Sequence, residues 1–210
     1  MNKNKAKQIE ELFIEKYKDA VCTLDYTTDI EFLVASRLSA QCTDARVNIV
    51  TRNLFLKYKT VDDYANADIT ELETLIKSCG FYHGKAKSII ELSQQLIKNH
   101  NSKIPSELEQ LLALSGIGRK IANLVMGELF NKEAYVADTH CIRLSNRLGF
   151  VKSDVPKKVE DALRKYITKE NSLKFCHAAV SHGREVCKAR NPDCRGCFVF
   201  DLCEFKGIAI

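Results

Sequence analysis

The chain has 210 residues, a length that fits one large domain or two small ones. Hydrophobic residues make up 45% and charged residues 28%, with only 9 Gly and 3 Pro, which excludes a disordered, collagen-like or low-complexity chain. The 32 Lys and Arg residues against 27 Asp and Glu residues give a net charge of +5, which permits a polyanionic partner without requiring one.

The N-terminal segment, residues 1–20, mixes charged and apolar side chains at helical spacing and therefore predicts a helix. It contains neither the apolar region nor the small-residue cleavage site of a signal peptide. No apolar run in the sequence approaches the roughly 18 residues needed to span a bilayer. We therefore expect a cytoplasmic protein with no membrane partner, in a compartment that keeps thiols reduced.

Helical signals recur along the chain and strand signals do not, which predicts an all-α fold. Thr28 and Glu31 fit a capping box that opens one helix, and Thr43 is placed to cap the next. Asp68 precedes a further helix, whose apolar stripe stops at Gly80.

A hairpin between two apolar helices follows. Ser106 and Glu109 are expected to form another capping box, for a short helix that runs to a break at Gly116. Gly116 and Gly118 flank one aliphatic residue, a pattern typical of a helix-hairpin-helix. Such glycines allow positive φ and close approach of another backbone, while the loop N–H groups and the next helix dipole point at an anion such as a DNA phosphate. The alternative is an ordinary glycine-capped turn; Arg119, directly after it, favours the anion site.

Lys120 falls in the first turn of the helix predicted over residues 121–126, where the positive end of the helix dipole disfavours a cation. A lysine beside Arg119 and partly desolvated would more readily hold a neutral amine, which could attack a carbonyl-like carbon. The alternative for Lys120 is a solvated contact to a phosphate.

Asp138 precedes the helical run 141–148, which ends at Gly149, so its default role is that of a helix N-cap. If the fold brought Asp138 close to Lys120, its carboxylate could instead orient or deprotonate the amine and stabilise positive charge developing on a sugar.

Nine cysteines are many for a reducing compartment, and we expect the five scattered ones to be small buried apolar groups. The other four have the spacing C-x6-C-x2-C-x5-C and indicate a metal centre, for which zinc and a [4Fe-4S] cluster are both suitable. They are Cys187, Cys194, Cys197 and Cys203. Lys188, Arg190 and Arg195 lie between them and could track phosphates, or form a solvated basic loop around a structural metal.

Two further segments carry motifs: residues 38–44 read LSAQCTD, and residues 79–86 read CGFYHGKA, with aromatic residues after the glycine. The hairpin with Lys120, the segment 138–149 and the four cysteines follow in order. Together they resemble the endonuclease III family of DNA repair glycosylases over nearly the whole chain.

The resemblance implies a six-helix body that contains the hairpin, expected at residues 22–132, and a smaller helical lobe formed by residues 1–21 and 133–210. It also implies that the four cysteines hold a [4Fe-4S] cluster rather than zinc. We expect the cluster to be mainly structural and positional, because the basic residues between its ligands need a rigid loop and the reaction needs no electron transfer.

The implied activity is that of a DNA glycosylase and AP lyase in base excision repair, acting on duplex DNA that carries an oxidised pyrimidine or an abasic site. The damaged nucleotide would be flipped out of bent DNA. Lys120 would attack the sugar C1′, expel the base and form a Schiff base that leads to β-elimination, and Asp138 would activate the lysine. We expect a monomer that is nucleoid-associated through its DNA.

The resemblance also implies DNA contacts. Gln41 would fill the space left by the flipped base and Phe81 would wedge the duplex, while Gly116, Gly118 and Arg119 would hold phosphate. The alternatives are a surface amide for Gln41 and core packing at a helix end for Phe81.

Four positions depart from the usual family pattern: Arg37, Leu112, Ser115 and Ala137. They affect which bases are released and how fast, and they leave the chemistry of Lys120 and Asp138 intact.

Three other functions compete with this interpretation. A monofunctional mismatch glycosylase acting on adenine or thymine usually lacks the lysine, and a cluster-based electron carrier would not need the hairpin. The third is a DNA-binding metalloprotein that catalyses no reaction. Such a protein would cut no strand, and replacing Lys120 would leave its DNA binding unchanged.

Overall fold

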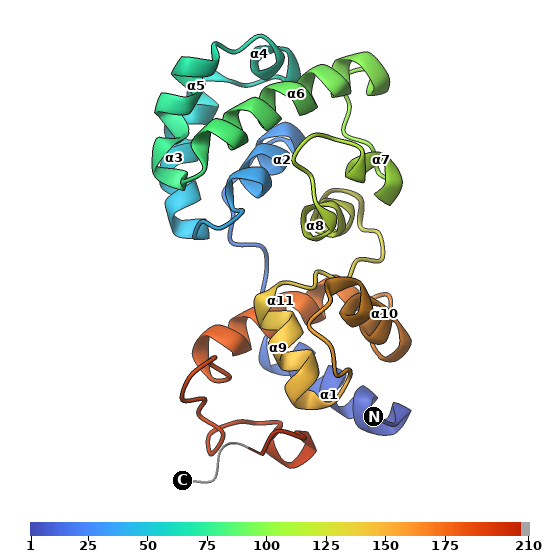
Figure 1. The fold of residues 1–210 in the computed structure, drawn as a ribbon. Coiled ribbons are helices and arrows are strands. Elements are labelled where there is room, and N and C mark those ends of the chain that lie inside the picture. Colours follow the sequence, from blue (N-terminus) through green and yellow to red (C-terminus); the bar gives the residue numbers. More distant parts are fainter. Residues whose placement is uncertain (207–210) are drawn as a thin grey trace. The chain divides into compact units, whose positions relative to one another are not determined.

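The computed structural model describes residues 1–206, and all of the regular elements in this range are helical (Figure 1). The predicted all-α fold is therefore confirmed. The chain divides into two compact units: a central unit, Thr23–Phe130, and a terminal unit, which combines Met1–Cys22 with the chain from Asn131 onward.

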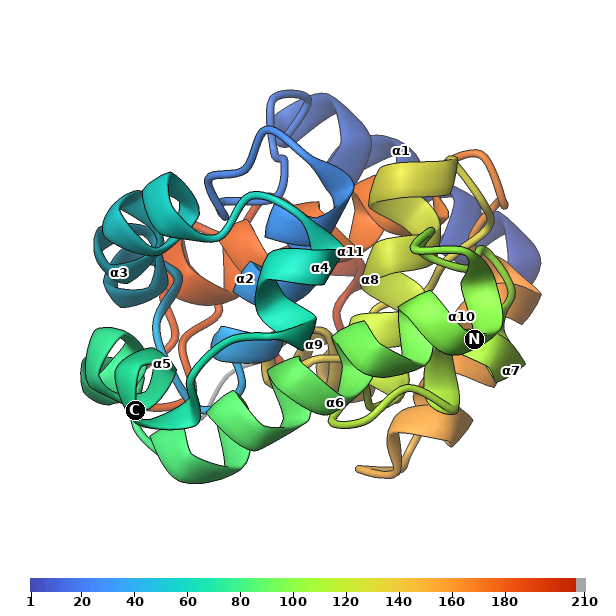
Figure 2. The same cartoon turned by 90° about the horizontal axis from the view of Figure 1, so that it is seen from above.

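The central unit is organised around the buried helix α2. Its helices are α2 (Asp29–Leu38), α3 (Asp44–Lys57), α4 (Val61–Ala65), α5 (Ile69–Ile76), α6 (Tyr82–His100), α7 (Leu108–Leu112) and α8 (Arg119–Phe130), with a 3₁₀ turn, η1, at Lys77–Cys79. Helix α2 packs against α3, α6 and α8, and the long α6 packs against α4 and α5 (Figure 2). Nearly every residue of α2 is buried, which explains its continuous apolar run.

The predicted caps of the central unit are confirmed at three helices. Thr28 and Glu31 form the capping box of α2, and the side chains of Thr43 and Asp68 accept the N-terminal N–H groups of α3 and α5. After α5 the chain passes through η1 and turns at Gly80, whose φ of 70° places it in the left-handed region.

The predicted capping box of Ser106 and Glu109 is wrong. Helix α7 begins at Leu108, and its N-cap residue, Glu107, makes no side-chain capping bond. The Ser106 hydroxyl instead donates to the Glu107 carboxylate at 3.5 Å. Leu111 is the buried residue of this short helix.

The terminal unit joins the two ends of the described chain. It contains α1 (Lys3–Lys16), α9 (Thr139–Leu148), α10 (Pro156–Tyr166), α11 (Ser172–Glu185) and a 3₁₀ turn, η2 (Phe200–Leu202). Helix α1 packs against α10 and α11, and α11 packs against α9. Phe13 and Phe175 place their ring centroids 5.2 Å apart in this core. None of the described helices has the length and apolarity to cross a membrane.

The capping box of α2 gives a test of the central unit. Replacing Thr28 with Ala removes the acceptor for the Glu31 N–H, so we expect the free energy of unfolding to fall by about 1 kcal/mol. Thr28→Ser keeps a hydroxyl and should retain most of this stability. Chemical denaturation of the two variants checks this; equal losses in both would show that the hydroxyl does not stabilise the helix.

Candidate functional site

The hairpin between α7 and α8 is held tightly at its first glycine. Gly116 has a φ of 73°, and a Cβ built there would lie 2.4 Å from Arg37 Nε and 2.8 Å from Ser88 Oγ. Gly118 has neither constraint, because its φ is not positive and a Cβ there would meet no atom within 4 Å. Positive φ was expected to be useful at both glycines, but only Gly116 uses it. Open space at Gly118 fits the close approach of another molecule.

Two of the departures from the family pattern support the hairpin. The Ser115 N–H donates to Gln95 Oε1 at 2.8 Å, and its hydroxyl donates to Glu91 Oε2 at 2.6 Å, both on α6. A proline at this position could make neither bond. Arg37 donates from Nε to Ser88 Oγ at 2.8 Å beside Gly116, and burial lowers the pKa of its guanidinium. This supporting role of Arg37 has no signal in the sequence.

Arg119 and Lys120 are the first two residues of α8. The backbone of the first turn is regular, since the Ala122 N–H donates to the Gly118 carbonyl at 2.9 Å. Arg119 is half-buried, whereas Lys120 is exposed. The partial desolvation expected for Lys120 is therefore absent from the DNA-free protein. Its amine lies in the first turn of a helix, where N–H groups attract anions.

Gln41 and Phe81 share an unusual backbone. Both have left-handed φ angles, 54° and 48°, and both are exposed. Phe81 immediately precedes α6 and is 72% exposed, so core packing, the alternative considered for it, is wrong. A large apolar side chain held out in water by a strained backbone is suited to contact a partner.

Asp138 is the N-cap of α9, as predicted. Its Oδ1 accepts the Cys141 N–H at 2.8 Å, and its Oδ2 lies 3.3 Å from Nδ1 of His140. The helix ends at Gly149, whose φ is 88°. Asp138 belongs to the terminal unit and Lys120 to the central unit.

The four clustered cysteines lie in the segment that follows α11, drawn in red in Figure 1. All four are free thiols of intermediate exposure. Burial raises the pKa of Cys194 and of Cys197, and the negative charges of neighbouring thiols in the same loop raise both further. The four sulfur atoms therefore act on one another electrostatically.

The donor set suits a thiolate-bound metal centre. Four cysteine thiolates are ligands that both a single zinc and a four-iron cluster accept.

Two arginines of α9 support the cysteine loop. Arg147 Nη1 donates to Cys187 Sγ at 3.2 Å and to the Lys188 carbonyl at 2.8 Å. Arg143 Nε donates to the Cys187 carbonyl at 3.1 Å. This supporting role was not predicted for either arginine, although their i, i+4 spacing indicates one helix face.

A histidine of α11 also contacts the cysteine loop. His182 Nε2 is 3.5 Å from Cys197 Sγ, and its Nδ1 is 3.1 Å from the Tyr17 hydroxyl. Burial lowers the pKa of His182 to about 4, so the imidazole is uncharged at neutral pH. The basic residues between the cysteines are exposed to solvent; they are Lys188, Arg190 and Arg195.

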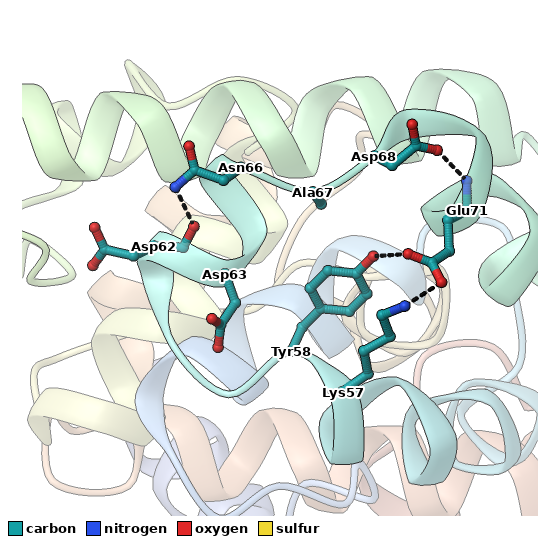
Figure 3. A pocket seen from close by; sticks show the side chains of 8 residues that line it. All are labelled: Lys57, Tyr58, Asp62, Asp63, Asn66, Ala67, Asp68 and Glu71. Carbon is teal, nitrogen blue, oxygen red and sulfur yellow. Dashed lines mark hydrogen bonds and ion pairs between the residues drawn. The ribbon is translucent and has the colours of Figure 1, made fainter.

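An acidic pocket of about 400 Å³ lies in the central unit (Figure 3). Two of its carboxylates have structural partners: Asp68 caps α5, and Glu71 contacts Lys57 and the Tyr58 hydroxyl. Its negative charge is unsuited to a phosphate, and it contains none of the predicted site residues. It is lined by Lys57, Tyr58, Asp62, Asp63, Asn66, Ala67, Asp68 and Glu71.

Comparison with known proteins identifies relatives over most of the chain. Residues 34–169 match the HhH-GPD superfamily base excision DNA repair protein family. An endonuclease III of Synechocystis sp. is 41% identical over 96% of this chain and 92% of the relative. An endonuclease III of Bacillus subtilis (strain 168) is 40% identical over 90% of this chain and 87% of the relative.

Solved structures show the same fold. A trapped endonuclease III–DNA covalent intermediate, an estranged-adenine complex, has a TM-score of 0.93 at 39% identity and covers 98% of this chain and 97% of that chain. A thermostable thymine-DNA glycosylase has a TM-score of 0.85 at 20% identity, with 97% of each chain covered. The second likeness concerns the fold alone.

Two glycines with similar φ angles, 70° and 73°, allow the hairpin contact to be tested. Gly80→Ala adds only the strain of a positive φ, because its surroundings are open, and should cost about 1–2 kcal/mol. Gly116→Ala adds the strain of a positive φ plus overlap with Arg37 and Ser88, and should cost about 1–3 kcal/mol more. Thermal unfolding of both variants measures the difference. Equal destabilisation would contradict the close packing described for Gly116.

Proposed function

The chain belongs to the endonuclease III family, which is part of the HhH-GPD superfamily, and we propose which of its residues carry the activity of that family. Endonuclease III proteins are DNA glycosylases with AP lyase activity. Lys120 is the nucleophile and Asp138 the assisting carboxylate. The substrate is duplex DNA with an oxidised pyrimidine or an abasic site. The observation that carries this proposal is a primary amine in the first turn of α8, directly after the constrained hairpin.

The reaction begins with attack of the neutral Lys120 amine on C1′ of the flipped nucleotide. The bond from C1′ to the base breaks, and the base leaves with the electron pair and takes up a proton. Loss of a proton from nitrogen and opening of the sugar give a Schiff base. Removal of a C2′ proton then breaks the C3′–O bond, which cuts the strand by β-elimination.

The hairpin prepares Lys120 for this step. Lys120 lies in the first turn of α8, directly after Arg119, where the hairpin fixes the start of its helix. Because Lys120 is exposed in the DNA-free protein, the exclusion of water comes from the bound DNA itself. The N–H groups near Gly116 and Gly118 bind the phosphate that positions the sugar.

Asp138 combines a structural and a chemical role. Its Oδ1 is engaged by the N-terminus of α9, which fixes the carboxylate. Its negative charge accepts a proton from the lysine and offsets the positive charge on the sugar. This division explains why the residue is both an N-cap and a catalytic candidate.

DNA contacts follow from the exposed residues. Phe81 wedges the duplex and Gln41 fills the space left by the flipped base, as their exposure and left-handed backbones support. Lys188, Arg190 and Arg195 add positive charge along the phosphates. The protein acts as a monomer on chromosomal DNA, in the cytoplasmic, nucleoid-associated location that this substrate requires.

The cysteine loop holds the [4Fe-4S] cluster that is general in this family. Its ligands are Cys187, Cys194, Cys197 and Cys203, and the cluster, when bound, supplies a rigid link between them. Arg143 and Arg147 fix the start of the loop through Cys187 and its neighbours. No step of the reaction uses the cluster for electron transfer.

Replacing Lys120 tests the nucleophile. We expect Lys120→Ala to lower the rate of strand cutting at an abasic site on the order of 10³-fold or more, with DNA binding retained. Lys98→Ala, at another exposed lysine of the central unit, is the matched control and should cut normally. Gel analysis of the products measures both. An unchanged rate in Lys120→Ala would sink the assignment, and base release without cutting by the native protein would support the monofunctional alternative.

Replacing Asp138 separates its two roles. Asparagine is as good an N-cap as aspartate, so Asp138→Asn should keep the melting temperature while lowering the cutting rate roughly 100-fold. Asp138→Ala should lower both the cutting rate and the free energy of unfolding, the latter by about 1 kcal/mol. Single-turnover kinetics and thermal unfolding measure the two effects. A normal rate in Asp138→Asn would mean that the carboxylate only caps the helix.

Removing one thiolate tests the cluster. We expect Cys194→Ser to lower the bound iron and to weaken DNA affinity, because the basic loop loses its rigid scaffold. Iron analysis and fluorescence anisotropy with labelled duplex measure these effects. Full DNA affinity in an iron-free protein would contradict the positional role of the cluster.

A further inference from the structure

Arg37 is a half-buried cation in the last turn of α2, and its hydrogen-bond partner is a neutral group. Its Nε donates to Ser88 Oγ at 2.8 Å, and the Ser88 hydroxyl in turn donates to the Lys85 carbonyl at 2.9 Å. Within residues 1–206 no carboxylate forms an ion pair with Arg37, and burial lowers the pKa of its guanidinium. The charge is therefore partly removed from water without an anion beside it.

A second cation lies close to Arg37. Lys85 is 1% exposed, and its ammonium donates to the Leu38 carbonyl at 2.8 Å and to the Cys79 carbonyl at 2.9 Å. Burial and, to a smaller extent, the charge of Arg37 lower the pKa of Lys85. The negative end of α2 offsets part of the two positive charges, but a helix terminus carries only about half an elementary charge. The end of α2 thus keeps an excess of positive charge.

A carboxylate on the same helix as Ser88 is engaged elsewhere. Glu91 Oε2 accepts the Ser115 hydroxyl at 2.6 Å, and Glu91 Oε1 lies 3.8 Å from Lys87 Nζ. It therefore supports the hairpin and an exposed lysine rather than Arg37. A cation that is partly desolvated without a counter-ion costs free energy, which a bound anion would recover.

The guanidinium of Arg37 lies directly beside the hairpin. A Cβ built on Gly116 would overlap Arg37 Nε, so the guanidinium contacts the hairpin backbone. Of its five N–H donors, the one on Nε serves Ser88, and those on Nη1 and Nη2 make no hydrogen bond with the described part of the chain. Neither Nη atom is among the fully buried polar atoms that lack a partner, so both have access to water. An anion held at the hairpin would find these donors available.

We propose that Arg37 is an additional DNA ligand, whose Nη1 and Nη2 groups donate to the backbone phosphate that the hairpin N–H groups hold. This inference rests on the proposed function, because it requires the hairpin to bind DNA. A guanidinium and a phosphate match in geometry and can form two parallel N–H···O bonds. Since Arg37 departs from the usual family pattern, the contact adds a charged ligand to those that the hairpin backbone supplies.

Such a contact differs measurably from a purely structural role of Arg37. A cation that neutralises one phosphate of duplex DNA releases condensed counterions, which adds about 0.9 to the slope of log Kd against log salt concentration. Support of the hairpin through the bond to Ser88 releases no counterions. The salt dependence of binding therefore separates the two roles.

The test measures binding of the cluster-loaded protein by anisotropy, on a duplex with a non-cleavable abasic analogue, between about 50 and 200 mM salt. We expect Arg37→Gln and Arg37→Leu to lower the slope by about 0.9 and to raise Kd about tenfold at the lowest salt. The first variant can keep a bond to Ser88 and the second cannot, so equal slopes in the two would assign the effect to the charge. Arg37→Lys keeps the charge and should keep the slope.

Two further variants serve as controls. Ser88→Ala removes the acceptor of the Nε bond but no charge, and should keep the slope. Lys98→Leu removes one charge near the other end of α6, about 15 Å from Ser88 along the helix and beyond the Debye length, and should also keep the slope. An unchanged slope in both neutral variants of Arg37, or an equal fall in either control, would overturn the proposal.

The phosphate itself is identified by replacing single phosphates near the abasic analogue with neutral methylphosphonates. At the phosphate held by the hairpin, the replacement should raise Kd about tenfold for the native protein and clearly less for Arg37→Gln, because the guanidinium is already absent. If no phosphate shows this coupling, Arg37 is not a phosphate ligand. Failure of the native protein to bind the unmodified duplex would instead count against the proposed function.

Discussion

Contact of the Gly116 backbone with Arg37 and Ser88 fixes the hairpin to the core of the central unit. Arg37 comes from α2 and Ser88 from α6, so the contact joins the hairpin to two core helices. The bonds of Ser115 to α6 hold the neighbouring residue. The direction in which α8 begins, and with it the place of Lys120, depends on this close approach.

Features that depend on residues three or four positions apart could be predicted from the sequence. The caps at Thr28, Thr43 and Asp138 are of this kind, because side chain and N–H lie within one helical turn. The start of α7 was predicted wrongly, because a matching capping pattern in the sequence does not ensure that the cap forms. Exposure of Lys120 was also missed, since it depends on how other helices cover the first turn of α8.

The cysteines also show that local patterns can be predicted from the sequence and distant contacts cannot. Their short spacing in the loop indicates a metal centre, because four ligands fall within one compact segment. The bond from Arg147 to Cys187 spans 40 residues. Such contacts follow from helix packing and have no local pattern. The five scattered cysteines, expected to be buried apolar groups, are therefore not all alike: Cys22 and Cys42 are partly exposed.

The central claim is that one particular amine carries the chemistry. The most direct measurement is to trap the protein on abasic duplex with borohydride, digest the complex and locate the sugar remnant by mass spectrometry. The account predicts the remnant on Nζ of Lys120. A remnant on another lysine or on the N-terminal amine would contradict it, whatever the activity of the variants.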